Sequence, residues 1–249
     1  MIKKNKINFY KKNGYLVLKN FIKKKYFIPL QESLNSILKL NIYSKKISFF
    51  DNKKINSTLF SLRRRKTFSK FYKTFQNLVG LDMIFFNKKL LLLVSKLLNC
   101  RDFDLNSSGK MLRLDAPSDD KFSYGWHQDS FYYNQNPKTN SGLVVLFPLS
   151  TTNEKNGSLK IIPCSQVGGR RVHKKDLNSG YFTIQNLSKN IVNNKLQFNY
   201  NLGDIIILNL NTIHASGENI SKSFRISAGI RFHSVKARDF KPYALKTVF

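Results

Sequence analysis

His127, Asp129 and His214 constrain this chain more than any other feature, because one fold must bring all three together if they are to hold a metal ion. One residue separates His127 from Asp129, so both side chains leave the same face of an extended backbone. They can therefore take two adjacent positions on one metal. The third ligand must come from elsewhere, and His214 follows the apolar segment 204–210, which predicts a strand buried on both faces.

Two histidines and one carboxylate in this order match the 2-His-1-carboxylate facial triad of non-haem Fe(II) oxygenases, which leaves metal positions open for a co-substrate and O2. Arg225 lies eleven residues after His214, where such enzymes bind the far carboxylate of 2-oxoglutarate, and Ser227 lies on the same strand face. A guanidinium and a hydroxyl can bind a carboxylate through charged hydrogen bonds worth roughly 1.5–3 kcal/mol each. Each of these residues alone also fits a structural or surface role. The ordered set predicts an iron site.

The segment pattern predicts a single mainly β (α+β) domain over 1–249, with a double-stranded β-helix (jelly-roll) core buttressed by N-terminal helices. Residues 1–105 are expected to form mixed helical support, 106–235 the core and 236–249 a C-terminal tail. Apolar spacing predicts helices within 27–40 and at 88–98. Strands are expected at the following segments: 15–18, 110–114, 143–149, 158–162, 204–210 and 224–232.

The formal charge of +29 invites a nucleic-acid interpretation. The excess is mostly Lys, it accompanies abundant Asn, Ile and Phe as A/T-rich codons would encode, and it is spread along the chain. The densest clusters, 23–25 and 63–66, carry no nucleic-acid motif. Solvated faces are therefore the favoured explanation, and a nucleic-acid partner is not expected. An anionic small-molecule substrate would still be drawn to such a surface.

The remaining bulk features fit a protein of a reducing compartment. Cys100 and Cys164 are too few for a disulfide framework and show no metal-binding spacing. The longest apolar run, 90–94, is far shorter than the roughly 20 residues of a membrane span. The apolar segment 15–18 is too short for the core of a signal peptide. We expect a cytoplasmic protein, and the sequence leaves its oligomeric state open.

The chain resembles the phytanoyl-CoA dioxygenase family of Fe(II)/2-oxoglutarate-dependent oxygenases. The resemblance covers most of the sequence and rests on these segments: Phe9 to Leu18, Met111-Leu112-Arg113-Leu114-Asp115-Ala116-Pro117, Trp126-His127-Gln128-Asp129, Asn156-Gly157-Ser158-Leu159 with Pro163, and Gly203-Asp204 through His214 to Arg225.

Two departures from the family pattern concern the surroundings of the site. After Pro163 the family usually reads Gly-Ser-His, whereas this chain has Cys164-Ser165-Gln166, which changes a loop near the mouth of the site. Some members place a basic residue before the metal loop to contact 2-oxoglutarate, and Asp115 takes that position here. Arg113 is the candidate to replace it.

The resemblance implies that His127, Asp129 and His214 hold Fe(II), while Arg225, with Ser227 and Arg113, orients 2-oxoglutarate. O2 is the second co-substrate, and succinate and CO2 are released. No catalytic residue is expected beyond the metal ligands, because none need act as an acid or base. Related halogenases have a small residue at the carboxylate position, so Asp129 favours hydroxylation of a small organic substrate.

Candidates for the substrate pocket are fewer and rest on position alone. Phe131, Tyr132 and Tyr133 directly follow the metal loop and could form an apolar wall, although core packing explains aromatic residues equally well. Arg170 and Arg171 follow two glycines and could meet a phosphate or carboxylate, although a solvated loop also explains them.

Two other classes of function stay open. The first is a non-catalytic jelly-roll protein that binds a ligand or partner without turnover; the complete triad disfavours it. The second is a basic protein associated with nucleic acid, which predicts tight binding with a steep salt dependence.

Overall fold

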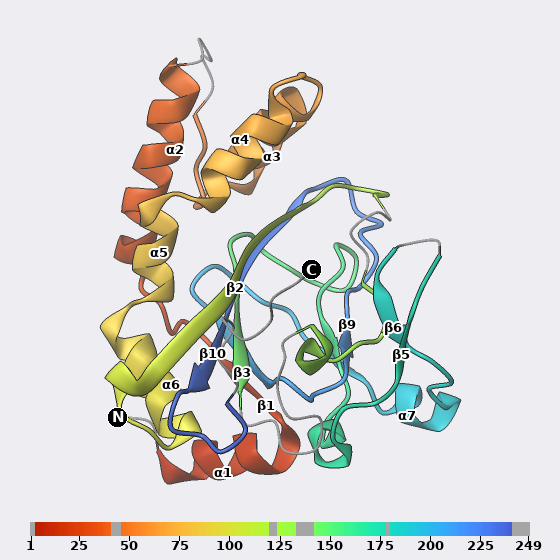
Figure 1. Cartoon of the computed structure of the whole chain (residues 1–249). Helices are drawn as coiled ribbons and strands as arrows, with labels where there is room; N and C mark the ends of the chain where they lie inside the picture. The colour runs from red at the N-terminus through yellow and green to blue at the C-terminus, as the bar shows by residue number, and fades with distance from the viewer. Residues whose placement is uncertain (1–2, 41–45, 120–123, 133–141, 178–179, 241–249) are drawn as a thin grey trace, which may run out of the picture.

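The computed structural model describes residues 3–40, 46–119, 124–132, 142–177 and 180–240. Its centre is an antiparallel sheet, with helices on one face and short strands on the other (Figure 1). The expected jelly-roll core with helical support is confirmed. In the described part of the chain, no helix is long and apolar enough to cross a bilayer.

The main sheet has five strands in the order β1-β8-β3-β10-β2, and every neighbouring pair is antiparallel. Their bounds are β1 Tyr15–Leu18, β2 Leu105–Asp115, β3 Leu143–Pro148, β8 Ile205–Asn209 and β10 Arg225–Ser234. All five contain or overlap strands expected from the sequence. β1 comes from the N-terminal part of the chain and completes the sheet beside β8, so the support region supplies a strand as well as helices.

Helices cover the outer face of the main sheet. They are α1 Lys4–Asn13, α2 Ile28–Leu40, α3 Asn52–Arg63, α4 Phe68–Gln76, α5 Val79–Phe85 and α6 Lys88–Leu98. Figure 1 shows α1, α2, α5 and α6 along one side of the sheet. Leu30 and Leu90 belong to the same buried cluster as Leu112, Phe147 and Ile207 of the sheet. This burial of apolar surface joins the helices to the strands.

Local signals fix the bounds of α6 as the sequence predicts. The Asn87 side chain accepts a hydrogen bond from the backbone N–H of Lys89, which caps the first turn. Asn99 adopts the left-handed conformation with φ 52°, which ends the helix.

The opposite, inner face of the main sheet packs on a smaller sheet. This second sheet has the order β7-β4-β9, with β4 Lys160–Ile161, β7 Leu196–Gln197 and β9 His214–Ala215. Ile161 is buried against Val144 and Ile206 of the main sheet. A further hairpin pairs β5 His173–Lys175 with β6 Phe182–Ile184, and the short helix α7 spans Lys189–Asn193.

β4 is shorter than the strand expected over 158–162. Gly157 adopts a φ of +84°, and an added Cβ there would lie 2.5 Å from the backbone oxygen of Gly217. The turn thus continues to the edge of β4, where only a glycine permits the close approach of the two backbones. Pro163 cannot donate a hydrogen bond to a neighbouring strand, which limits β4 at its other end.

Candidate metal centre and its cavity

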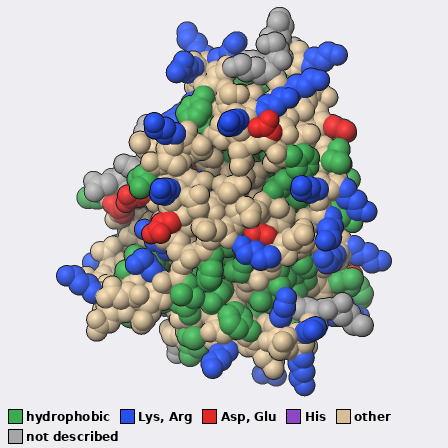
Figure 2. All heavy atoms as spheres, turned by 180° about the vertical axis from the view of Figure 1, so that it is seen from behind, with side chains coloured by type: hydrophobic (Ala, Val, Ile, Leu, Met, Phe, Trp, Pro, Cys, Tyr) green, Lys and Arg blue, Asp and Glu red, His purple; other side chains and the backbone are tan. Residues whose placement is uncertain are grey.

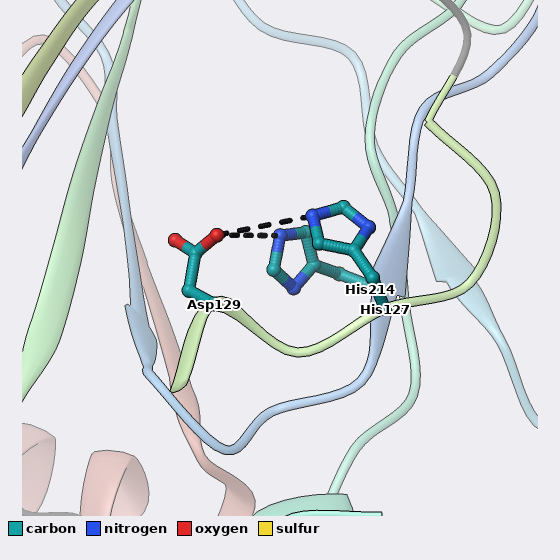
Figure 3. A group of neighbouring side chains, drawn as sticks. All are labelled: His127, Asp129 and His214. Atoms are coloured by element: carbon teal, nitrogen blue, oxygen red, sulfur yellow. Dashed lines mark ion pairs between the residues drawn. The ribbon is translucent and has the colours of Figure 1, made fainter. Parts of the chain in front are cut away.

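His127, Asp129 and His214 converge on one point between the two sheets (Figure 3). One ligand atom from each residue lies within 4.8 Å of the other two, and all three side chains are buried. Asp129 Oδ1 lies 3.8 Å from His127 Nε2 and 4.0 Å from His214 Nε2. These distances exceed hydrogen-bond length, so the two imidazoles face the carboxylate across a shared space.

A backbone pairing brings the two histidines together. His127 and His214 form an isolated antiparallel β-bridge in which each N–H donates to the other residue's carbonyl, at 2.9 and 3.0 Å. Side chains of such directly opposed residues leave the same face of the pair. The imidazole centroids are consequently 4.2 Å apart.

Gln128, between two of the predicted ligands, points the other way and is completely buried. Its Nε2 donates to the carbonyls of Gly169 and Asn211 at 2.8 and 2.6 Å, while its Oε1 accepts from the Arg171 N–H at 2.7 Å. Gln128 therefore joins the segment that carries His127 to the one that carries His214.

Both imidazoles present a lone pair to the shared space. His127 Nδ1 lies 2.8 Å from the carbonyl oxygen of Gly125, and His214 Nδ1 lies 2.9 Å from that of Thr212. A carbonyl oxygen can only accept, so each Nδ1 carries the proton and each Nε2 is left as a potential ligand. Burial, followed by the nearby His214, lowers the pKa of His127 to about 3, and burial also lowers the pKa of His214. Two neutral imidazoles and a carboxylate suit a divalent transition metal such as iron.

Arg231 is a neighbour of the triad that sequence reasoning missed. Its Nε lies 3.1 Å from Asp129 Oδ2 and its Nη2 lies 3.2 Å from Asp129 Oδ1. Burial raises the pKa of Asp129, but Arg231 and the two histidines outweigh that effect and hold the pKa at about 2. Asp129 is therefore an ionised ligand at neutral pH.

The triad lies in the wall of a cavity of about 320 Å³. The inner face of the main sheet contributes apolar side chains, among them Met111, Leu146 and Ile206. The predicted residues His127, Asp129, His214, Arg225, Ser227, Arg113 and Tyr132 all line this one cavity.

Two of the three residues predicted to bind 2-oxoglutarate, Arg225 and Arg113, contact Asp115. Arg225 is buried and donates from Nε and Nη2 to Asp115 Oδ2 at 2.9 and 2.6 Å. Arg113 donates to Asp115 Oδ1 at 3.2 and 2.9 Å and to Ser216 Oγ at 2.9 Å. Ser227 lies opposite Arg113 in the β10–β2 pairing. Asp115 thus bridges two arginines of the cavity wall.

The structure brings only part of the predicted substrate set to the cavity. Tyr132 lines it, and its hydroxyl lies 3.1 Å from both the N–H and the carbonyl of Phe182. Phe131 instead stacks on His173, with centroids 4.5 Å apart. The reason is local: Asp129–Phe131 form a 3-10 turn, so the alternation of an extended chain ends at Asp129.

The other candidates lie away from the cavity or outside the described residues. Arg170 Nη1 reaches the carbonyl of Ser130 at 3.4 Å, and Arg171 is exposed. Neither belongs to the described cavity wall. Tyr133 lies outside the described residues.

Tyr124 is a second residue of the site that sequence reasoning missed. Its ring lies 5.4 Å from the His127 imidazole and stacks at 3.8 Å on Tyr181, and the Arg113 guanidinium lies 5.1 Å from its centre. Its position three residues before His127 is the only signal in the sequence, and it is a weak one.

Loop 164–166, where the sequence departs from the family pattern, packs against helix α1. Gln166 Nε2 donates to the carbonyls of Lys11 and Lys12, at 3.2 and 3.0 Å. Ser165 Oγ accepts from the Ile213 N–H at 2.8 Å, directly before the ligand His214. This loop therefore supports the segment that carries His214.

Basic side chains are spread over the face of the molecule shown in Figure 2. Figure 2 shows Lys and Arg scattered among polar and apolar groups on one face of the molecule, without gathering into a single stripe. Such a distribution is typical of solvated faces.

Comparison with known proteins identifies the family. The profile described as Phytanoyl-CoA dioxygenase (PhyH) matches residues 10–227, which include the triad, Arg113, Arg225 and Ser227. The chain belongs to the phytanoyl-CoA dioxygenase family. No curated protein matches it in a sequence search.

Solved structures share the fold at low sequence identity. EvdO2 from Micromonospora carbonacea var. aurantiaca, complexed with 2-oxoglutarate, has a TM-score of 0.63 and 14% identity, covering 97% of this chain and 96% of that one. The epimerase SnoN, in complex with Fe3+, alpha ketoglutarate and nogalamycin RO, has a TM-score of 0.65 and 10% identity, covering 95% and 85%. EctD from S. alaskensis, with 2-oxoglutarate and 5-hydroxyectoine, has a TM-score of 0.58 and 16% identity, covering 97% and 79%.

Proposed function

We propose that this protein is an Fe(II)- and 2-oxoglutarate-dependent dioxygenase that hydroxylates a small organic substrate. One observation carries the proposal: two neutral imidazoles and an ionised carboxylate converge at the wall of the cavity that also contains Arg225. Membership of the phytanoyl-CoA dioxygenase family supports it. So do the 2-oxoglutarate and iron named for proteins of the same fold.

Iron bound here with 2-oxoglutarate would supply oxidative decarboxylation, which releases succinate and CO2 and delivers an oxygen atom to a C–H bond. The residues of this chain would bind and orient the reactants. His127, Asp129 and His214 would hold the metal as three ligands, and a triad of this kind leaves other metal positions available. The protonation of the two histidines is fixed, because Nδ1–H of each imidazole donates to a backbone carbonyl and Nε2 is left without a proton.

Arg225 and Ser227 are proposed to bind the far carboxylate of 2-oxoglutarate, with Arg113 nearby. Asp115 occupies the Nε–Nη2 edge of Arg225. The Nη1 group and the Ser227 hydroxyl are then the groups we assign to the co-substrate. Met111, Leu146 and Ile206 line the same cavity as Arg225 and Ser227, and apolar surroundings strengthen a charged contact of this kind.

Hydroxylation is the proposed outcome because Asp129 provides a carboxylate where related halogenases have a small residue. SnoN, which is described as an epimerase, is a reminder that one fold hosts several outcomes. Tyr132 and Tyr124 are proposed to contact the substrate, since they line the cavity beside His127.

The proposal is tested by the conversion of 2-oxoglutarate. Purified protein is incubated with Fe(II), ascorbate, O2 and 2-oxoglutarate, and succinate is measured with and without a panel of small-molecule substrates. We expect succinate formation that rises with a true substrate, yields a product one oxygen atom heavier, and disappears in His127→Ala. Equal succinate formation by the wild type and His127→Ala would refute the proposal.

A further inference from the structure

Arg231 makes a two-point contact with the carboxylate of the candidate metal ligand Asp129. Nε and Nη2 of one guanidinium face the two oxygens of one carboxylate, at 3.1 and 3.2 Å. Both side chains are buried, so water does not compete for this contact. A planar guanidinium facing a carboxylate in this way fixes the plane of the carboxylate as well as its position.

An irregularity in the sheet supports the guanidinium from the other side. The β10–β2 register shifts between Gly229 and Arg231, so that β2 carries an extra residue at this point. Gly109, in the bulged stretch, adopts a φ of 56°, and its carbonyl accepts a hydrogen bond from Arg231 Nη1 at 2.7 Å. Bulges next to functional sites re-aim side chains in this manner. Arg231 is thereby held between a backbone carbonyl and Asp129.

The two oxygens of Asp129 consequently have different surroundings. Oδ1 is the oxygen nearest to His127 Nε2 and His214 Nε2. Arg231 contacts both oxygens, Oδ2 through Nε and Oδ1 through Nη2. Only Oδ1 faces the space shared by the three ligands.

We propose that Arg231 is a positioning residue that keeps Asp129 a one-oxygen ligand of the metal. This inference rests on the metal site of the proposed function. A carboxylate that bound through both oxygens would occupy one more metal position, which the co-substrate needs. By holding both oxygens, Arg231 fixes the carboxylate plane, so that Oδ1 stays turned toward the two imidazoles and Oδ2 stays turned away from them.

The alternative is that Arg231 is only a counter-charge for Asp129. In that case a bound cation would compete with Arg231, and removal of the guanidinium would tighten metal binding. Lysine separates the two roles, because it keeps the positive charge but cannot reproduce the two-point contact.

The test measures Co(II), as an air-stable substitute for Fe(II), binding to the full chain by calorimetric titration. We expect Arg231→Lys to weaken Co(II) binding by about 10–100-fold, the usual effect of losing a group that orients a ligand. Arg231→Gln should weaken Co(II) binding as well, even though it removes a positive charge that repels the bound cation. At saturating Co(II), the visible absorption bands, which report the ligands around the ion, should differ between Arg231→Lys and the wild type. The exposed Arg238→Gln is the matched control and should change neither readout.

Circular dichroism verifies that each variant is folded. If Arg231→Gln does not fold, the Co(II) affinity of Arg231→Lys alone decides between the positioning role and the counter-charge role. Wild-type affinity in Arg231→Lys, or tighter binding in either variant, would overturn the inference while leaving the proposed function intact. Failure of the wild-type protein to bind Co(II) would instead overturn the metal site on which both proposals rest.

Discussion

Asp115 accepts two hydrogen bonds from Arg225 through Oδ2, while its Oδ1 accepts two from Arg113. One carboxylate therefore serves two arginines in the cavity wall, and the three groups together carry a net positive charge. The far carboxylate of 2-oxoglutarate would bring this cluster to neutrality. We propose that Arg113, two residues earlier in the same strand, takes the role of the basic residue that Asp115 replaces.

Removing the charge of Asp115 should destabilise the protein. In Asp115→Asn the buried Arg225 and the half-buried Arg113 lose their shared counter-charge. Breaking a buried ion pair such as the one with Arg225 costs about 3–5 kcal/mol in the free energy of unfolding. Chemical denaturation followed by circular dichroism measures this quantity. Asp119→Asn, whose partner Arg63 is exposed, is the control and should cost under about 1 kcal/mol. Equal losses in the two variants would contradict the bridging role of Asp115.

Arg225→Lys should weaken 2-oxoglutarate binding with little effect on the metal. Losing one charged hydrogen bond costs roughly 1.5–3 kcal/mol, which corresponds to about 10–100-fold in affinity. Titration of 2-oxoglutarate into Co(II)-loaded protein measures the change, and Ser227→Ala should show a smaller loss because its hydroxyl is neutral. If the variant lost metal affinity and retained 2-oxoglutarate affinity, the assignment of Arg225 would be wrong.

Gln128→Ala should weaken metal binding, although Gln128 is not itself a proposed metal ligand. The substitution leaves two buried carbonyls and one N–H without the partner they have now, at about 1–3 kcal/mol for each unsatisfied group. We expect a lower melting temperature together with weaker Co(II) binding. Gln185→Ala, at an exposed position, should change neither. A destabilised variant with unchanged Co(II) affinity would restrict Gln128 to a structural role.

The metal-free protein should lose stability in acid below about pH 6.5. The pKa of His127 is lowered from 6.5 to about 3 in the folded state, so between these values the unfolded state binds the additional proton. Stability from this group is fully present above pH 6.5 and declines by about 1.4 kcal/mol per pH unit as pH falls toward 3. His214, whose pKa is also lowered, acts in the same direction.

Unfolding titrations of metal-free wild type and His127→Gln, at several values between pH 3 and 7, measure this dependence. The free energy of unfolding should change less steeply with pH in His127→Gln, by the equivalent of about one bound proton. Parallel profiles for the two proteins would show that His127 is not buried in its neutral form.

The convergence of His127, Asp129 and His214 could be predicted from the sequence, because it follows from local alternation and from the order of the segments. The alternation of an extended chain places His127 and Asp129 on one face, and strand β8 ends near His214. β1 and α6 have the predicted bounds, since an Asn-Gly turn precedes β1 and side-chain and left-handed caps define α6.

Contacts that depend on strand register could not be predicted. Asp115 meets Arg225 only because β2 and β10 pair in the register that places them opposite each other. The contact between Arg231 and Asp129 depends on a bulge that no local pattern announces. Phe131 is a sequence candidate for either the cavity wall or core packing, and a single 3-10 turn directs it to His173.

The most direct test of the central claim is the visible spectrum of the protein with Fe(II) and 2-oxoglutarate in the absence of oxygen. Chelation of iron by 2-oxoglutarate at the triad produces a weak charge-transfer band. We predict that this band appears in the wild type, weakens in Arg225→Ala and vanishes in His127→Ala. A correctly folded wild-type protein that shows no band, even at saturating Fe(II) and 2-oxoglutarate, would contradict the oxygenase assignment and favour a jelly-roll protein that binds a ligand without turnover.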